Sequence, residues 1–226
     1  YRNEKPKNNF LKKVRQIATK NKVVLIFDEC TSGFRSTFGG LHKKYKVYPD
    51  MCIFGKAIGN GYPITVVMGK KEIMQKAQDT FISSTFWTDR VGPAAAIKTL
   101  EIMEKDKSWE KITKLGKYLN SEWLKIAKVN KLSIKIEGLP AISKFTIIGK
   151  NFNAYKTYIT QEMLKKNILA SNIIYLSIYH DKKILNQYLD LLNDLFKEIN
   201  KFENDKEDIF SKIEGPMAKK PFERLN

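Results

Sequence analysis

The chain has 226 residues, of which 42% are hydrophobic and 29% are charged, and its formal net charge is +17. This composition is close to that of an ordinary globular protein and excludes wholesale disorder and collagen-like repeats. The two cysteines, Cys30 and Cys52, lack the spacing of a zinc site or a disulfide scaffold, so we expect no metal. No apolar run approaches the roughly 18 residues that cross a bilayer, and no signal peptide is recognised, so we expect a cytoplasmic protein without a membrane partner.

The excess of basic residues is one feature that nucleic-acid-binding modules share. Lysine and arginine total 41 against 24 acidic residues, yet only five of the 41 are arginine, the residue that readers of bases and phosphates favour. The lysines are spread along the whole chain. We therefore favour a solvated lysine surface with a weak, salt-sensitive attraction to polyanions, and we expect no specific nucleic-acid partner.

Residues 1–129 show helical and strand patterns in alternation, which predicts an α/β domain with a mostly parallel sheet. The apolar run Val23–Phe27 is expected to be a central strand covered on both faces. In chain order we predict a helix at 10–17, strands at 23–27, 51–54 and 64–68, and helices at 72–78, 91–105 and 109–128.

A smaller α+β domain is predicted to follow, over residues 130–202. The pattern indicates strands at 133–137 and 141–148, a helix at 155–166, a strand at 173–178 and a helix at 182–202. Residues 203–226 are mostly polar and are expected to form a C-terminal tail.

Asp28 and Glu29 directly follow the apolar run, at a position where parallel α/β sheets bind ligands. A carboxylate there is costly to desolvate unless a cation pairs with it. An ordinary aspartate that bonds a loop at the strand end is at least as good an interpretation of this residue alone. His42 lies among lysines and is expected to be a surface residue.

Lys56 follows another short predicted strand and precedes the glycine-rich loop at 59–63. A lysine between apolar residues and glycines is placed to lose water, and such an amine can attack a carbonyl group and form a Schiff base. Because the chain has many other lysines, this position alone is weak evidence. The glycines would let the backbone approach a bulky planar group.

The segment Ser83–Thr88 is rich in hydroxyl groups and leads into a predicted helix. Hydroxyl groups near a helix N-terminus form an anion site, although simple N-capping by Thr88 or Asp89 explains them equally well. The aspartate, the lysine and this loop follow one another in the order that pyridoxal phosphate requires. The aspartate keeps the pyridine nitrogen protonated, the lysine forms the Schiff base, and the loop donates to the phosphate.

At these residues the sequence resembles the class III aminotransferases, a family that includes the glutamate-1-semialdehyde aminomutases. The matching segments are Val23–Arg35 (VVLIFDECTSGFR), Pro49–Pro63 (PDMCIFGKAIGNGYP), Met68–Met74 and Leu176–His180. The resemblance spans about residues 20–200. It implies the pyridoxal-phosphate transferase fold of type I, with a partial large domain and a C-terminal small domain.

The resemblance also implies a role for four residues. Lys56 would carry the cofactor and transfer protons, Asp28 would bind the pyridine nitrogen, and Cys30 would pack against the ring. Thr85 would reach the phosphate bound by the neighbouring subunit, which implies a homodimer with shared active sites. The residues that follow Thr85 depart from the usual aminomutase pattern, which favours the aminotransferase.

Members of this family are roughly twice as long as this chain, and we read the chain as the C-terminal part of such an enzyme. The expected function is amino transfer between a small-molecule amino donor and an oxo acceptor through a Schiff base on Lys56. The alternative enzyme is glutamate-1-semialdehyde 2,1-aminomutase. Two alternatives outside the enzymes are also kept: an inactive fragment and a basic nucleic-acid-binding module. Residues 1–226 alone are expected to be inactive.

Overall fold

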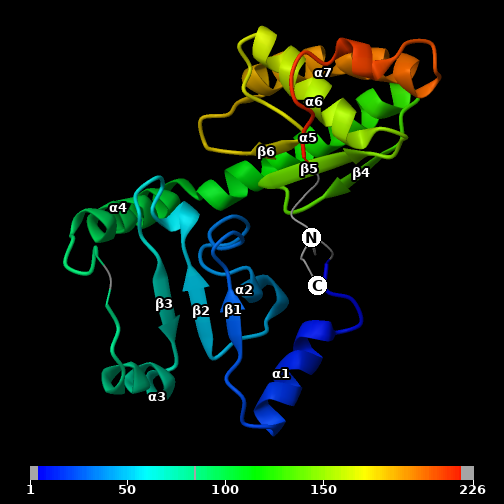
Figure 1. The fold of residues 1–226 in the computed structure, drawn as a ribbon. Coiled ribbons are helices and arrows are strands. Elements are labelled where there is room, and N and C mark those ends of the chain that lie inside the picture. Colours follow the sequence, from blue (N-terminus) through cyan, green and yellow to red (C-terminus); the bar gives the residue numbers. More distant parts are fainter. Residues whose placement is uncertain (1–4, 84, 220–226) are drawn as a thin grey trace. The chain divides into compact units, whose positions relative to one another are not determined.

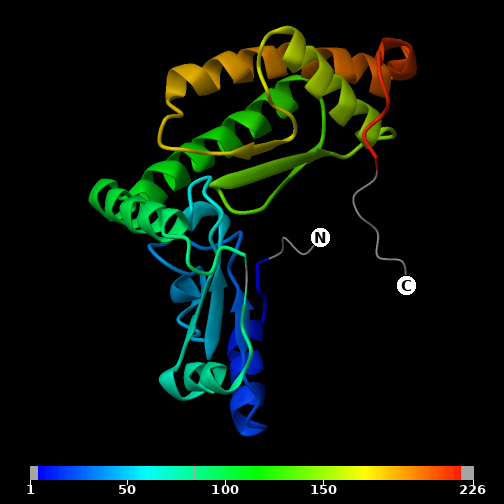
Figure 2. The same cartoon turned by 60° about the vertical axis from the view of Figure 1, so that its left-hand side comes forward.

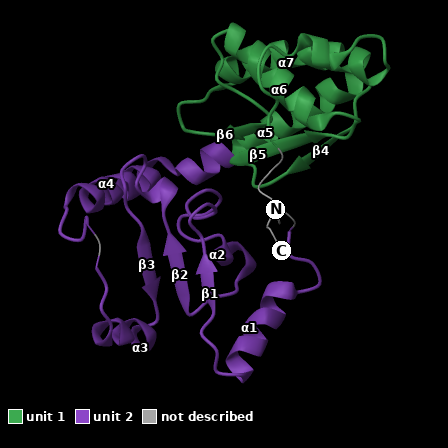
Figure 3. Cartoon of the chain, viewed as in Figure 1, with its two compact units in different colours: residues 1, 114–226 green, residues 2–113 purple. Residues whose placement is uncertain are grey.

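A computed structural model describes residues 5–83 and 85–219. The chain divides into two compact units, residues 2–113 and residues 114–226 with residue 1 (Figure 3). The division falls within helix α5 (Ser108–Val129), whereas the sequence places a domain boundary after this helix, at residue 129. That boundary stays a prediction, and each unit is described below by itself.

The unit of residues 2–113 contains a three-stranded sheet with the order β1-β2-β3 (Figure 1). Strand β1 (Ile26–Asp28) pairs in parallel with β2 (Met51–Phe54), as the sequence predicts. Strand β3 (Val66–Gly69) pairs with β2 in the antiparallel sense. The connection from β2 to β3, residues 55–65, is too short for a parallel crossover, and this explains the reversal.

Strand β1 is shorter and more exposed than the apolar run predicts. Val23, Val24 and Ile26 have exposed fractions of 58%, 45% and 48%, and within the described residues β1 pairs with β2 alone. The backbone of Leu25 is held by Asp50, since its amide donates to the Asp50 carboxylate and its carbonyl accepts from the Asp50 amide. The start of the run is therefore tied to a loop instead of a neighbouring strand.

Helices flank this sheet (Figures 1 and 2). The buried cluster at its centre joins Phe34, Cys52, Phe54, Ile58 and Ala96, and so connects β2 to the start of the longest helix of this unit. The helices of this unit are α1 (Phe10–Lys20), α2 (His42–Tyr45), α3 (Lys71–Met74) and α4 (Val91–Asp106), with 3₁₀ turns η1 (Lys56–Ile58) and η2 (Gln75–Asp79).

The unit of residues 114–226 contains an antiparallel sheet with the order β4-β5-β6. The ring of Phe145 on β5 contacts Trp123 of α5 and Phe196 of α7, so both helices pack on the same face of this sheet. A Cβ at Gly116 of α5 would lie 1.7 Å from the carbonyl oxygen of Pro140, and only glycine allows this close approach. The elements are β4 (Ile134–Glu137), β5 (Ile142–Ile147), α6 (Phe152–Lys165), β6 (Ile173–Tyr175) and α7 (Lys182–Glu203).

The described residues after α7 run back along α6. They form a 3₁₀ turn, η3 (Ile209–Lys212), in which Ile209 is buried. The Gln161 side chain donates to the carbonyl of Lys212 and accepts from the amide of Glu214, so this segment is anchored to α6. None of the helices in residues 5–83 and 85–219 combines the length and apolar composition needed to cross a bilayer.

Candidate active site

The sheet of residues 2–113 brings Asp28 and Lys56 to the carboxyl ends of two neighbouring parallel strands. Asp28 is the last residue of β1 and lies opposite Ile53 of β2. Lys56 follows β2 after a single glycine and begins the turn η1. Such an edge is where parallel sheets place their ligands, so the sequence-predicted pair occupies a suitable place.

Asp28 is held as a carboxylate by its surroundings. The amide of Cys30 donates to Asp28 Oδ1 at 3.0 Å. Hydrogen bonds from the Cys30 amide and thiol, together with the charge of Lys56, lower the pKa of Asp28. The same carboxylate accepts from the Cys30 thiol and raises its pKa, with burial adding to the effect. At neutral pH the site therefore holds a negative charge at Asp28 beside a protonated thiol.

The backbone of Lys56 adopts the left-handed conformation, with φ at 48°, which non-glycine residues seldom use. Its Nζ donates to Thr31 Oγ1 at 2.5 Å, so the amine reaches the loop that follows Asp28. The side chain is exposed in the structure, in contrast to the desolvated lysine that the sequence suggests. A Cβ at Gly55 would lie 3.6 Å from the Cys30 sulfur, which brings Cys30 next to the lysine backbone.

Glu29 and His42 form a buried pair that the sequence reasoning missed. Glu29 is only 4% exposed and accepts hydrogen bonds from the backbone amides of Leu41 and His42 at 2.9 Å each. Its Oε1 lies 3.0 Å from His42 Nδ1. A Cβ at Gly40 would lie 2.3 Å from that nitrogen, so glycine is required here.

The expectation that His42 is a surface residue is therefore wrong. Its side chain is 12% exposed and packs near the rings of Phe27 and Tyr48. Neighbouring lysines suggest solvent exposure, but the turn at Gly39 and Gly40 rotates the histidine inward. The only signal in the sequence was the Gly-Gly pair before it.

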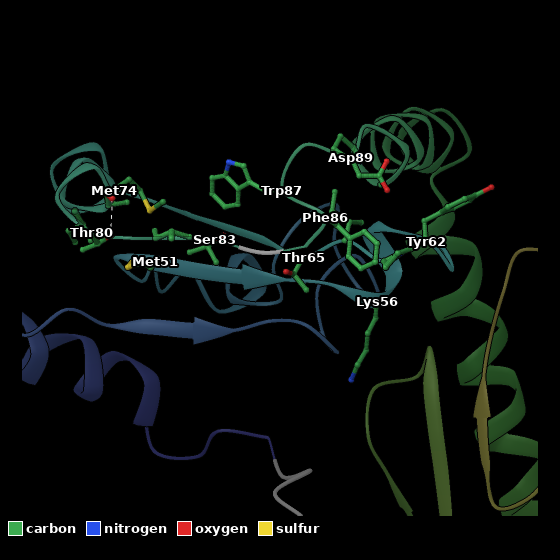
Figure 4. A pocket seen from close by; sticks show the side chains of 18 of the residues that line it. Met51, Lys56, Tyr62, Thr65, Met74, Thr80, Ser83, Phe86, Trp87 and Asp89 are labelled. Atoms are coloured by element: carbon green, nitrogen blue, oxygen red, sulfur yellow. Dashed lines mark hydrogen bonds between the residues drawn. The ribbon is translucent and has the colours of Figure 1, made fainter.

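Thr85 is exposed and belongs to the loop that borders a cavity of about 1130 Å³ (Figure 4). Lys56 lies at one end of this cavity, and its side chain extends away from Phe86 and Trp87 (Figure 4). Thr85 itself is not one of the lining residues, and within this chain the described contacts do not join it to Asp28 or Lys56. The cavity is lined mainly by apolar and aromatic residues of β2, β3, α3, the loop 59–65 and the segment 80–93. They include Met51, Tyr62, Val67, Met74, Phe86 and Trp87.

The N-cap of α4 is Arg90, which makes no side-chain cap bond, so neither Thr88 nor Asp89 is the N-cap residue, although Asp89 bonds the first amide of the helix. Asp89 Oδ1 accepts from the amide of Val91 at 2.9 Å, at the start of α4. Ser84, in the same segment, lies outside the described residues. Ser83 and Thr85 are exposed.

Solved structures of related fold cover most of this chain. A structure of the FumI protein of Sphingopyxis sp. MTA144, in its PLP internal aldimine form, matches with a TM-score of 0.79 at 22% identity. It covers 85% of this chain and 47% of that chain. Acetylornithine aminotransferase from Elizabethkingia anophelis matches with a TM-score of 0.73 at 24% identity over 85% of this chain and 50% of that one. These likenesses show that this chain has part of the fold of the pyridoxal-phosphate transaminases.

Curated relatives are similar at the level of sequence. The 3-aminobutyryl-CoA aminotransferase of Cloacimonas acidaminovorans (strain Evry) is 34% identical over 186 residues, which are 82% of this chain and 44% of the relative. The glutamate-1-semialdehyde 2,1-aminomutase of Methanococcoides burtonii is 32% identical over 187 residues, 81% of this chain and 42% of the relative. The chain thus spans about half the length of the curated relatives it matches. The family profile described as Aminotransferase class-III matches residues 4–172, and the chain belongs to this family.

Proposed function

We propose that this chain carries the lysine-bearing part of a pyridoxal-phosphate-dependent aminotransferase. The observation that supports this most strongly is that an ionised Asp28 and the Lys56 amine both lie at the carboxyl ends of the parallel strands β1 and β2. The donor set fits the cofactor, because a fixed carboxylate matches a protonated ring nitrogen and an exposed primary amine matches an aldehyde.

Pyridoxal phosphate, when bound, supplies an electron sink that stabilises the negative charge formed when the Cα–H bond of an amino acid breaks. Asp28 would hold the charge on the ring nitrogen and so support that role. Lys56 Nζ would bind the aldehyde carbon with loss of water, and after release by the substrate amine it would take up and return the proton at Cα. Cys30 would lie against the ring and exclude water.

We also infer a homodimer with shared active sites, in which Thr85 donates to the phosphate held by the partner subunit. Thr85 is exposed and has no described contact to Asp28 or Lys56 of its own chain, which is compatible with a partner across an interface. The substrates would be a small-molecule amino donor and an oxo acceptor.

The aminomutase is kept as a second candidate, because relatives named for each activity have nearly the same identity to this chain. The two reactions differ in where the amino group goes. In the complete protein, an aminotransferase passes a labelled amino group to a separate oxo acceptor, whereas an aminomutase returns it to the same carbon skeleton. Isotope transfer between two substrates therefore distinguishes them.

Borohydride reduction of the complete protein with bound pyridoxal phosphate, followed by peptide mapping, tests the assignment of Lys56. We expect a pyridoxyl group on Lys56 and its loss in Lys56→Ala. The control is Lys71→Ala, which removes an exposed lysine of α3 and should leave the labelled peptide unchanged. A pyridoxyl group on another lysine, with none on Lys56, would overturn the proposal.

A further inference from the structure

The turn that follows Asp28 is fixed by hydrogen bonds that it donates to the carboxylates of Asp28 and Glu29. The amide of Cys30 donates to Asp28 Oδ1 at 3.0 Å, and the Ser32 hydroxyl donates to Glu29 Oε2 at 2.5 Å. The amide of Gly33 donates to the carbonyl of Glu29 at 2.8 Å. Thr31 lies between the residues that make these bonds, so the position of its side chain is set by the turn.

Glu29 cannot move without breaking further contacts. It is buried, and its carboxylate also accepts from the amides of Leu41 and His42 and lies against His42 Nδ1. A Cβ at Gly33 would lie 2.6 Å from the ring of Phe54, so the end of the turn rests directly on strand β2. The turn is therefore held in place at the carboxyl ends of β1 and β2, where Lys56 also lies.

Lys56 is constrained at both of its ends. Its backbone is held in the left-handed region at the start of η1, and its Nζ donates to Thr31 Oγ1 at 2.5 Å. A long side chain that is exposed to solvent would otherwise sample many rotamers, and this entropy would be lost whenever the amine is ordered for reaction. The bond to the Thr31 hydroxyl favours one position of the amine over the others.

We propose that Thr31 is a positioning residue for the Lys56 amine. The inference rests on the proposed function, in which this amine is the reactive group. Thr31 Oγ1 holds Nζ beside Asp28 while the amine is free, and releases it when Nζ bonds to a carbonyl carbon. When the substrate amine displaces the lysine, the hydroxyl receives Nζ again and keeps it within reach of the Cα proton.

The test is competitive acetylation of the purified, cofactor-free complete protein by acetic anhydride, with each lysine quantified by mass spectrometry. The bond to Thr31 holds the amine against the turn, and we expect the reagent to reach it mainly when this bond is open. A hydrogen bond of ordinary net strength keeps it bonded about five times as often as free, so Thr31→Val should raise the labelling rate of Lys56 about fivefold relative to Lys71. Thr31→Ser keeps the hydroxyl and should label as the wild type does.

Thr19→Val is the matched control, because Thr19 is also exposed but its hydroxyl bonds to Arg15 within helix α1. Thermal unfolding of each variant, followed by circular dichroism, checks that the fold is retained; Thr31→Ala replaces Thr31→Val if the latter does not fold. A Lys56 rate within twofold of the wild type in Thr31→Val, or an equal rise in Thr31→Ser, would overturn the inference. The experiment contains no cofactor, so its failure is distinct from the absence of a pyridoxyl group on Lys56, which would overturn the proposed function.

Discussion

Replacement of Asp50 by asparagine is expected to destabilise the unit of residues 2–113 by about 2.5 kcal/mol at pH 7, although the two side chains have nearly the same shape. The buried Asp50 carboxylate joins the beginning of β1 to helix α1 and to the end of β3. It accepts from the Leu25 amide at 2.8 Å, from Arg15 Nη1 at 2.8 Å and from Lys70 Nζ at 2.7 Å. Asparagine has no charge and only one acceptor atom. Its oxygen can keep the bonds from the Leu25 amide and Arg15, which share one oxygen of Asp50, but without the charge, and it loses the bond from Lys70 to the second oxygen.

The magnitude follows from how exposed each partner is. The Leu25 amide can still bond to the neutral oxygen of asparagine, so we assign about 1 kcal/mol to the loss of the charge at this bond. The Arg15 side chain is 22% exposed and Lys70 is 53% exposed, so we assign about 1 kcal/mol to the first pair and about 0.5 kcal/mol to the second. Accordingly, Arg15→Ala should destabilise the unit more than Lys70→Ala does.

The effect should depend on pH in one direction. Hydrogen bonds from Lys70, from the Leu25 amide and from Arg15 hold the pKa of Asp50 well below its ordinary value. Because the pKa is lower in the folded than in the unfolded chain, the stabilisation is fully present above about pH 5 and is lost as the pH falls below about 4. The variant has no carboxylate to protonate, so its difference from the wild type should narrow in that range.

Hydrogen exchange, followed by mass spectrometry of peptides from β1, β2 and β3, measures the stability of this unit separately from that of residues 114–226. Asp79→Asn is the matched control, because Asp79 is 73% exposed and pairs only at 3.7 Å with Lys76. It should change stability by less than about 0.5 kcal/mol. An equally small effect of Asp50→Asn at pH 7, or a difference from the wild type that does not narrow below pH 4, would refute the reasoning.

Two further predictions concern the active site of the complete protein. Asp28→Asn should slow breaking of the Cα–H bond on the order of 10² to 10⁴-fold, because the charge that holds the protonated ring nitrogen is lost; a single-turnover rate within threefold of the wild type would assign Asp28 a purely structural role. Mixing inactive Lys56→Ala and Thr85→Ala subunits should restore up to half of the wild-type activity per hybrid dimer, because both lesions then fall in one of its two sites. Proven subunit exchange without recovery would place Thr85 and Lys56 in the same site of a single chain.

The long helices were predictable because each one shows an apolar stripe over several turns. The observed α4, α5 and α7 begin and end within a few residues of the predicted ranges. Strand bounds were less predictable, because a short apolar run has no period that fixes its ends. Val23 and Val24 have the composition of a strand, yet the bonds between Leu25 and Asp50 delay the strand until Ile26. To predict the direction of β3, the length of the connection between β2 and β3 is needed as well as the apolar pattern of the strand.

The site was predictable as far as it depends on chain order. Asp28 and Lys56 each follow a strand, and neighbouring parallel strands bring such residues to one edge. The hydrogen bond between Thr31 and Lys56 depends on the shape of a turn and on the left-handed backbone of Lys56, neither of which an apolar pattern encodes. The inward rotation of His42 likewise depends on local backbone geometry at Gly40.

The sheet of residues 2–113 has two edges that pair with no other strand among the described residues, and both carry exposed apolar side chains. Val24 and Ile26 are 45% and 48% exposed near β1, and Val67 of β3 is 48% exposed.

Unpaired strand edges of this kind are templates for pairing with other chains. We therefore expect residues 1–226, expressed alone, to associate beyond a dimer as concentration rises, as measured by multi-angle light scattering. Val24→Lys combined with Val67→Lys should reduce this association, because lysine on an edge strand opposes pairing between chains. Val129→Lys adds the same charge at a 75% exposed position at the end of helix α5, and it should leave the association unchanged. If the helix variant reduces association as much as the edge variant does, net charge and not strand pairing controls it. A wild-type chain that stays monomeric would show that these edges are already protected.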